Sequence, residues 1–402
     1  MSAPGKTTYL PSLQGFGLYI HIPWCVKKCP YCDFNSHELN DSASYADYTA
    51  QLIADFTEDY LCYKLALKDK SLRSIFFGGG TPSLMPAELL KTVTTHIEGS
   101  IQQNAKDFSL DTIEVTLEAN PGTCEYTDFG LIRKAGINRL SIGAQSFSDK
   151  QLKVLGRIHQ AQQIEQAFRK AREAGLNNIN IDIMYGLPQQ TVQQALDDLQ
   201  KALQLKPEHI SWYQLTLEPN TAFFSKPPAH LPHDDTLADI AEAGQQLLAD
   251  HGFERYEVSA YAQAGKQSQH NLNYWRFGDY LAIGAGAHGK VSTLEAQSHT
   301  TVRYRKTRLP RDYLKASPPI KISAPVEEES IAFEFMLNRL RLFEPISFNE
   351  WEHATGLPAS ALIRKTHKSA LFSLGKDSLS LSQHGQLFLD DAVSLFLNES
   401  RT

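Results

Sequence analysis

Three cysteines stand close together near the start of the chain, in the stretch LYIHIPWCVKKCPYCDF. They are Cys25, Cys29 and Cys32, with the spacing C-x3-C-x2-C. The other two cysteines, Cys62 and Cys124, are isolated on separate predicted elements. Clustered thiolates can hold zinc or an iron–sulfur cluster, and two thiols in a C-x-x-C pair can exchange disulfides. The C-x3-C-x2-C spacing fits these three chemistries to different degrees.

The three chemistries make different demands on the chain. Structural zinc needs four protein ligands, and His21 or His37 would complete such a set only by an accident of folding. A redox pair would use Cys29 and Cys32 and leave Cys25 without a role. A [4Fe–4S] cluster normally takes four thiolates, so three would leave one iron open to an external ligand. An open iron suits a cluster that must hold and reduce a small molecule.

The motif CVKKCPYC, which follows the strand-like run LYIHIP, resembles the signature of the radical S-adenosylmethionine (SAM) family. The resemblance implies that Cys25, Cys29 and Cys32 ligate a [4Fe–4S] cluster. In that family the open iron chelates the amino and carboxylate groups of SAM, and the reduced cluster can cleave a sulfonium C–S bond. Cys62 and Cys124 are interpreted as buried structural residues.

Short β-rich runs that alternate with amphipathic helical patterns must position these cysteines. The predicted strands are residues 18–23, 74–79, 112–121, 139–146, 178–188 and 209–219. Such alternation predicts parallel strands with crossover helices. We therefore expect an α/β fold, a partial TIM-type (β/α)6 barrel of the radical SAM kind, over residues 18–290.

Glycine-rich or polar turns follow several of these runs, as in GGGTPS, EANPG, AQSF and YGLP. In parallel α/β folds, ligands bind where the carboxyl ends of the strands converge. The resemblance implies that the SAM contacts are Tyr19, Gly79, Gly80, Thr81, Glu118, Gln145, Arg157 and Asp182. Arg157 could pair with the methionine carboxylate, and Asp182 could accept hydrogen bonds from ribose hydroxyls.

The pattern changes after about residue 290. Residues 291–325 are polar and are interpreted as an irregular linker. Residues 326–402 contain helical patterns and a hairpin, which predict a smaller C-terminal α+β domain that is winged-helix-like and resembles the C-terminal domain of HemN. Without a basic recognition face, this domain is interpreted as a packing or interaction module. Residues 1–17 are interpreted as an N-terminal extension.

Composition limits the class of protein. The chain has 402 residues and a formal net charge of -6, with 42% hydrophobic and 21% charged residues. These values are ordinary for a globular protein and argue against a general nucleic-acid binder. No apolar run approaches the length of a bilayer span, and the N-terminus lacks the pattern of a secretory signal or a transit peptide. The five cysteines are too few and too clustered for a disulfide framework, which suits a reducing compartment, so we expect a cytoplasmic protein.

Within the radical SAM family, the resemblance is to the coproporphyrinogen-oxidase-like branch and covers nearly the whole chain. It rests on YIHIPWC, GGGTPS, EANPG, SIGAQSF, LGRIH and DIMYGLP. Two kinds of member are close, the oxygen-independent coproporphyrinogen III oxidases and the HemW-type heme chaperones. The oxidases have another cysteine where this chain has Phe34, and a longer segment before the position of Leu18. HNLNYW, residues 270–275, matches a motif typical of the heme chaperones.

The HNLNYW stretch has chemistry that suits heme. A neutral imidazole such as His270 is a common axial ligand of heme iron, while Tyr274 and Trp275 offer flat apolar surface. Arg276 could pair with a propionate. The alternative is a structural network that closes the barrel. The surrounding polar tract is interpreted as an accessible loop, and His159 and His288 are interpreted as structural residues or neighbours of the SAM pocket.

We therefore expect a heme chaperone that carries a [4Fe–4S] cluster and SAM, and takes heme as its cargo. The expected partners are heme and acceptor hemoproteins, with no nucleic acid. Membrane-bound acceptors would imply a peripheral membrane encounter, and a homodimer is compatible with the sequence. The alternative is an oxygen-independent coproporphyrinogen III oxidase, a radical enzyme that removes two propionate carboxylates. A tRNA- or peptide-modifying enzyme lacks a supporting motif.

Overall fold

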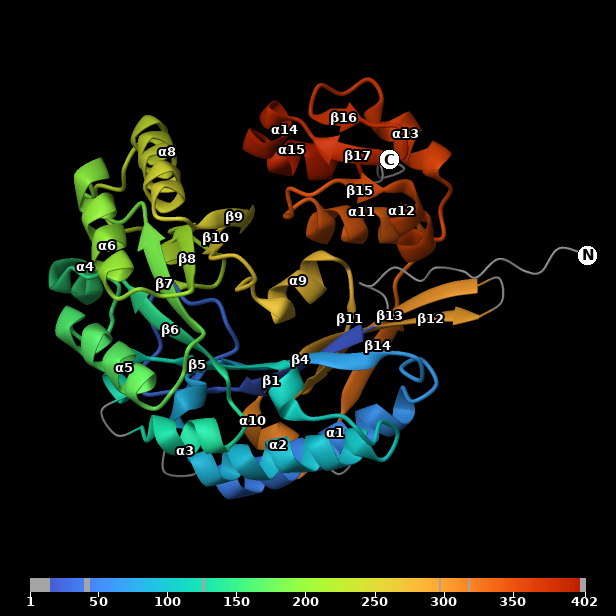
Figure 1. Ribbon diagram of the computed structural model, residues 1–402, viewed down its shortest axis with the longest axis horizontal. Helices are drawn as coiled ribbons and strands as arrows, with labels where there is room; N and C mark the ends of the chain where they lie inside the picture. The colour runs from blue at the N-terminus through green and yellow to red at the C-terminus, as the bar shows by residue number, and fades with distance from the viewer. Residues whose placement is uncertain (1–14, 40–43, 125–126, 296–297, 317–318, 398–402) are drawn as a thin grey trace, which may run out of the picture.

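The computed structural model describes residues 15–39, 44–124, 127–295, 298–316 and 319–397. Its centre is a twelve-stranded sheet with the order β14-β13-β12-β11-β1-β4-β5-β6-β7-β8-β10-β9. The two outermost strands, β14 and β9, do not pair with each other, so the sheet is an open, partial barrel (Figure 1). The predicted α/β fold is confirmed.

The six predicted strands are present as the parallel core of this sheet. They are β1 (Gly15–Ile22), β4 (Ser71–Gly79), β5 (Glu114–Ala119), β6 (Arg139–Gln145), β7 (Ile179–Tyr185) and β8 (His209–Gln214). A seventh parallel strand, β11 (Asp279–Ile283), pairs with the free side of β1. Nearly every residue of β1 is buried, as expected for a strand covered on both faces.

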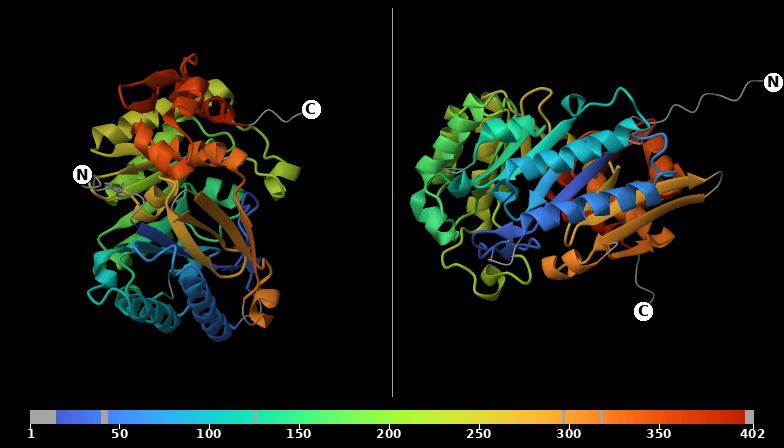
Figure 2. Two further views of the ribbon diagram at one scale, coloured as in Figure 1. Left: turned by 90° about the vertical axis from the view of Figure 1, so that its right-hand side faces the viewer. Right: turned by 90° about the horizontal axis from the view of Figure 1, so that it is seen from below.

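Helices cover the outer face of the parallel strands. They are α1 (Tyr45–Cys62), α2 (Ala87–Gln102), α3 (Phe129–Lys134), α4 (Asp149–Val154), α5 (Ala161–Glu173), α6 (Val192–Gln204) and α8 (Asp234–Asp250). The helices α1 and α2 lie side by side across this face (Figure 2). Their apolar stripes and the strands form one continuous core.

Short elements lie at both ends of the parallel strands. These are β2 (Trp24–Cys25), β3 (His37–Glu38), α7 (Ala222–Ser225), α9 (Gln269–Trp275) and the 3-10 turns η2 (Pro82–Leu84), η3 (Leu110–Thr112) and η4 (Pro121–Thr123). The antiparallel strands β9 (Glu254–Glu257) and β10 (Ala260–Ala262) extend the sheet beyond β8.

Residues 291–325 are not an irregular linker, which corrects the interpretation from the sequence. They contribute to β12 (His288–Glu295), β13 (Ser298–Lys306), α10 (Pro310–Lys315) and β14 (Lys321–Pro325), and the three strands continue the sheet beyond β11. The physical reason is a buried ion cluster. Lys306 is fully buried between Asp55 and Asp59 of α1, so a residue that looks solvent-exposed in the sequence is part of the core.

The C-terminal region forms a separate small domain. Its elements are α11 (Glu328–Arg339), β15 (Ile346–Ser347), α12 (Phe348–Thr355), α13 (Ala359–Thr366), β16 (Phe372–Leu374), β17 (Ser378–Leu381), α14 (Gln383–Leu387) and α15 (Leu389–Ser394). The helices enclose their own core together with a three-stranded sheet, as the predicted α+β domain requires. Phe277, just after α9, is inserted into this core and joins the domain to the barrel.

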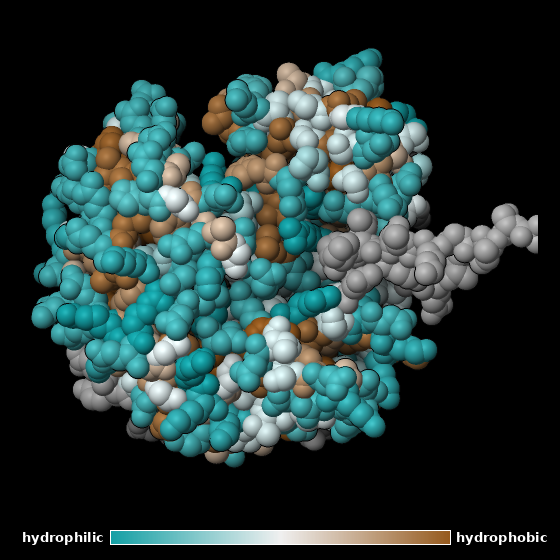
Figure 3. All heavy atoms as spheres, viewed as in Figure 1, coloured by the Kyte–Doolittle hydropathy of each residue, from teal (hydrophilic) through white to brown (hydrophobic). Residues whose placement is uncertain are grey.

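The surface is largely hydrophilic, with apolar side chains gathered on parts of the C-terminal domain (Figure 3). Leu387 and Phe388 are among the exposed apolar residues there. Among the described residues, no helix combines the length and the apolar character needed to cross a bilayer.

Candidate functional site

The three cysteines of the motif lie in a loop at the carboxyl end of β1. Cys25 belongs to β2, which pairs with β3, and the amide of Cys32 donates a 3.2 Å hydrogen bond to the carbonyl of Cys29. All three thiols are free and half-buried, and they line one cavity of about 310 Å³, which we call the cysteine cavity. The predicted ligands are therefore brought together.

The arrangement of the thiols bears on which metal group they could hold. Among the described residues, no group of three or more His, Cys, Asp and Glu side chains is placed to hold one metal ion. A [4Fe–4S] cluster spreads its thiolates over different irons, so the sulfurs need not converge on one point. Burial raises the pKa of the Cys25 thiol, while a hydrogen bond from Thr81 and the charge of Arg157 favour its thiolate.

Seven of the eight predicted SAM contacts line the cysteine cavity. They are Gly79, Gly80, Thr81, Glu118, Gln145, Arg157 and Asp182. The eighth, Tyr19, lines an adjoining cavity instead. Parallel pairing of β4, β5, β6 and β7 brings these residues together, because it places all four carboxyl ends at one edge. Gly79 has a φ of +116°, and a side chain there would collide with the ring of His21.

Arg157 connects the cysteine loop to the end of β6. Its Nη1 lies 3.6 Å from the sulfur of Cys29, and its Nη2 donates a 2.8 Å hydrogen bond to the carbonyl of Gly143. Within the described residues, its Nε is buried without a hydrogen-bond partner. Burial alone would lower the pKa of Arg157, but Tyr31 and Cys29 raise it on balance. The guanidinium therefore stays charged and has an unused donor beside the cavity.

Glu118 and Asp182 place two carboxylates in the wall of the cavity. Oε2 of Glu118 accepts a 3.1 Å hydrogen bond from the amide of Gly79. Burial, followed by repulsion from Asp182, raises the pKa of Glu118 from 4.5 to about 7. Asp182 accepts hydrogen bonds from Asn180 at 2.7 Å and from Ser141 at 3.1 Å, and burial raises its pKa. Ser141 and Asn180 were not found by sequence reasoning.

Gln145 is held in an unusual conformation at the end of β6. Its φ is +70°, which is rare for a residue with a side chain, and the pairing with β7 shifts register at this point. The hydroxyl of Tyr213 donates a 2.7 Å hydrogen bond to its Oε1. The strain is therefore supported by a specific contact, and the side chain faces the cysteine cavity.

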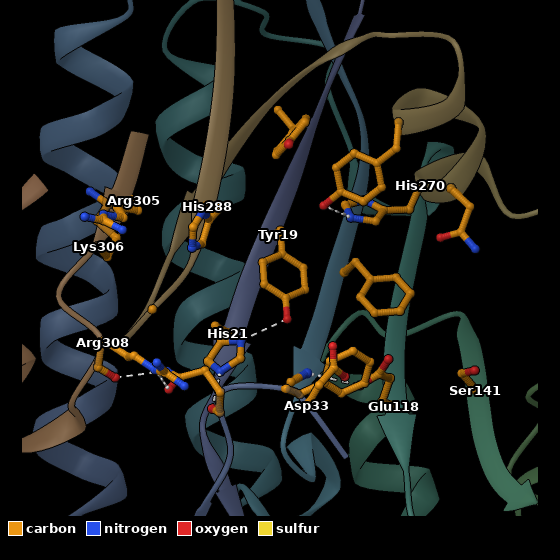
Figure 4. A pocket seen from close by; sticks show the side chains of 18 of the residues that line it. Tyr19, His21, Asp33, Glu118, Ser141, His270, His288, Arg305, Lys306 and Arg308 are labelled. Carbon is orange, nitrogen blue, oxygen red and sulfur yellow. Dashed lines mark hydrogen bonds between the residues drawn. The ribbon is translucent and has the colours of Figure 1, made fainter. Parts of the chain in front are cut away.

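A second and larger cavity of about 1120 Å³ adjoins the first, and we call it the large cavity. The two share a wall made by Phe34, Gly79, Glu118, Ser141 and Asp182. Strand β1 sends Tyr19 and His21 into the large cavity (Figure 4). Nε2 of His21 donates to the carbonyl of Asn35 at 2.9 Å, so its Nδ1 accepts from the hydroxyl of Tyr19 at 2.9 Å.

His270 also lines the large cavity, but it does not lie in a loop as the sequence analysis expected. It is in α9, where Ser268 caps the helix and the buried carboxylate of Glu114 accepts the amides of Gln269 and His270. These partners, distant in sequence, explain how a polar tract forms a helix. His270 is 1% exposed, and its ring nitrogens bond to Ser74 and Tyr274, both at 2.9 Å.

The opposite wall of the large cavity comes from β12 and β13 and was not predicted. His288, Arg305 and Arg308 face the cavity from these strands and the turn that follows (Figure 4). His288 and Arg305 are direct partners in the antiparallel register. Arg305 and Arg308 lie in the region interpreted as a linker, so the sequence signal there, an alternation of polar and apolar residues in VRYRK, was missed. His288 had been interpreted as a structural residue or a neighbour of the SAM pocket.

The fold and the cysteine loop define the class of protein. The radical SAM superfamily model matches residues 19–202, and the HemN C-terminal domain model matches residues 326–388. In a comparison of structures, coproporphyrinogen III oxidase (HemN) from Escherichia coli, a radical SAM enzyme, is 18% identical to this chain. That match has a TM-score of 0.74 and covers 96% of this chain and 90% of the other, which establishes a shared fold. The chain has the architecture of a radical SAM protein.

Relatives that are similar in sequence identify the family within the radical SAM proteins. The heme chaperone HemW of Haemophilus influenzae is 47% identical over 97% of this chain and 100% of its own length. The heme chaperone HemW of Escherichia coli is 44% identical over 96% of this chain and 99% of its own length. The HemW of Bacillus subtilis is 31% identical, with 95% and 99% covered. The chain belongs to the HemW heme chaperone family.

Proposed function

We propose that this protein is a heme chaperone, which binds heme in the large cavity and passes it to acceptor hemoproteins. The relatives named as heme chaperones match it over nearly their full lengths. The observation that carries the proposal is the large cavity itself. Its volume of about 1120 Å³ is slightly above the usual range for small-molecule sites and is sufficient for a porphyrin.

The cysteine cavity would hold the two cofactors. Cys25, Cys29 and Cys32 would ligate the [4Fe–4S] cluster, and SAM would lie against Gly79, Gly80 and Thr81. Free, half-buried thiols and the unpaired Nε of Arg157 support this assignment. When bound, the cluster supplies an electron that can reductively cleave the sulfonium of SAM.

The residues around the cavity have separable roles. The Arg157 guanidinium contacts the sulfur of Cys29 and offers a charged donor to the methionine carboxylate. Asp182, held by Asn180 and Ser141, presents acceptor oxygens to the ribose hydroxyls. The bond from Tyr213 holds Gln145 in its rare conformation, so that its amide stays directed at the cavity.

The wall shared by the two cavities would place the heme cargo next to the SAM cofactor. Phe34, Gly79 and Glu118 contact both cavities, so a heme in the large cavity would lie next to SAM. Phe34 also stands where the oxidases carry an additional cysteine, which favours the chaperone over coproporphyrinogen oxidation. The likeness to the oxidase structure, at 18% identity, concerns the fold alone.

One anaerobic assay tests the proposal. Protein with a reconstituted cluster receives SAM and a reductant, and both heme binding and coproporphyrinogen III conversion are followed by absorption. We expect saturable heme binding, no repeated turnover of porphyrinogen, and transfer of heme to the apo-form of a hemoprotein. A transfer rate that rises with acceptor concentration indicates direct handover, whereas a rate independent of the acceptor indicates release into solution. Multiple turnovers to protoporphyrinogen would establish an oxidase instead.

A further inference from the structure

The ring of His288 differs from those of the other two histidines in the large cavity. Both ring nitrogens of His21 are hydrogen-bonded, to Tyr19 and to the carbonyl of Asn35. Both nitrogens of His270 are bonded as well. Among the described residues, we find no hydrogen bond to the ring of His288, which lies exposed at the cavity. A metal takes the lone pair of an imidazole nitrogen, so a ring without partners can bind it at the least cost.

The surroundings of His288 also favour the form that binds metals. Partial desolvation of the ring at the cavity, with the positive charges of Arg305 and Arg303 as lesser causes, lowers the pKa of His288. The neutral imidazole therefore predominates near neutral pH. The lowered pKa thus agrees with the position of the ring, which lies at the cavity with no hydrogen bond among the described residues.

Two cations line the same cavity as His288. Arg305 faces it directly across β12 and β13, and such cross-strand partners have Cβ atoms about 5 Å apart. Arg308 donates through Nε to Oδ1 of Asn35 at 3.1 Å, which orients its guanidinium and leaves the other donors available. Within the described residues, neither arginine forms an ion pair, although arginines elsewhere in the chain, such as Arg303 and Arg339, do so.

Exposed apolar side chains border the same cavity. Phe34 on the cysteine loop is 58% exposed, and Ile322 on β14 is 56% exposed. Large apolar groups at the wall of a cavity favour a ligand that would cover them. The wall thus combines an imidazole without partners, two unpaired cations and apolar surface.

We propose that His288 ligates the iron of heme, that Arg305 and Arg308 bind its two propionates, and that Phe34 and Ile322 contact the macrocycle. The inference rests on the proposed function, because it assigns the residues of that same heme site. These groups match the three parts of heme, which are a central iron, two carboxylates and a flat apolar ring. His270, with both nitrogens engaged, is then part of the wall, and iron ligation falls to His288 instead.

Heme titration of His288→Ala tests the ligation. We expect the difference spectrum of histidine-ligated heme to be lost, heme affinity to fall at least roughly tenfold, and added imidazole to restore the spectrum. His251→Ala is the matched control, because His251 is exposed and bonds only to the carbonyl of Leu247 within the described residues. His288 is also exposed, so its variant should fold, which circular dichroism would verify. An unchanged heme spectrum and affinity in His288→Ala would overturn the ligation.

Two porphyrin probes distinguish propionate binding by the arginines from iron ligation by the histidine. Metal-free protoporphyrin IX lacks iron, so His288→Ala should bind it like the unaltered protein, while Arg305→Gln and Arg308→Gln should bind it roughly tenfold more weakly. Heme dimethyl ester lacks free carboxylates, so the arginine variants should bind it like the unaltered protein. Arg169→Gln, at an exposed position on α5, is the control.

The outcomes distinguish this inference from the proposed function. If the arginine variants bind protoporphyrin IX as tightly as the unaltered chain, the propionate assignment is wrong. If the unaltered chain binds heme but His288→Ala and the arginine variants match it, the heme site lies elsewhere and the chaperone proposal stands. If the unaltered chain binds no heme, the proposed function itself fails.

Discussion

The amide of Gly79 at the end of β4 donates a 3.1 Å hydrogen bond to the carboxylate of Glu118 on β5. Both residues line the cysteine cavity and the large cavity. Because burial and the nearby Asp182 raise the pKa of Glu118 to about 7, the charge in this shared wall changes close to neutral pH. A carboxylate between two ligand sites can thus connect their occupancy to protonation.

Glu118 makes the stability of the chain depend on pH. Its folded pKa is about 7 and its ordinary value is 4.5, so folding favours the protonated form. The loss of folding stability that comes from ionising buried Glu118 is absent below pH 4.5, grows as the pH rises to about 7, and is then constant. Glu118→Gln removes this cost, so its gain in unfolding free energy over the unaltered protein should be larger at pH 8 than at pH 4.5, by at most about 3 kcal/mol. Urea unfolding of cluster-free protein at several pH values measures this, and a difference that does not vary with pH would contradict it.

Cys29→Ser should abolish the absorption of a reconstituted [4Fe–4S] cluster and leave the chain folded. Cys29 lies in a partly exposed loop, so the change disturbs no packing, while serine cannot replace a thiolate ligand. Iron and sulfide analysis with circular dichroism measures both effects. Cys62→Ser is the matched control, since Cys62 is exposed at the end of α1 and not buried as the sequence analysis expected. A full cluster spectrum in Cys29→Ser would refute the ligand assignment.

Arg157→Lys should weaken SAM binding by roughly tenfold or more, because lysine lacks the planar fork that spans Cys29 and Gly143. Equilibrium dialysis with labelled SAM on cluster-loaded protein measures the affinity, and iron content verifies that the cluster is retained. Arg169→Lys, on the surface, should bind SAM normally. Equal SAM affinity in Arg157→Lys and Arg169→Lys would remove Arg157 from the SAM site.

Two helical glycines should respond in opposite ways to alanine. In α8, a side chain at Gly244 would overlap the buried ring of Trp212, so Gly244→Ala should lower the free energy of unfolding by about 1–3 kcal/mol. In α2, Gly99 faces open space, so Gly99→Ala should raise it by about 0.5–1 kcal/mol through helix propensity. Denaturant unfolding measures both. Stabilisation by Gly244→Ala would mean that α8 and β8 pack less closely than described.

Much of the barrel could be predicted from the chain. The six parallel strands are apolar runs that end in glycine, proline or polar residues, and this pattern follows from burial on both faces. The cysteine motif is local in sequence, so its three thiols must lie close together in any fold. Parallel topology then places successive strand ends at one edge, which is why seven of the eight expected SAM contacts line one cavity.

The misses share one physical cause, which is pairing between groups far apart in sequence. Lys306 is buried because two carboxylates from α1 neutralise it, and no local pattern reveals that β13 belongs to the core. The HNLNYW segment is helical because Glu114 accepts the first amides of α9. Sequence analysis predicts that a polar residue is exposed when the partner that would allow its burial is distant in sequence and unknown.

The sequence by itself determined the cysteine motif, the parallel strands and the residues at the strand ends, because these depend on local spacing and on hydrophobic periodicity. Only the tertiary structure decided that both nitrogens of His270 are engaged, and that His288 and Arg305 face the large cavity as direct partners. Whether a histidine keeps a ring nitrogen free depends on every neighbour that the fold brings to it. The availability of a ring nitrogen is therefore a property of packing, and it cannot be predicted from residue spacing along the chain.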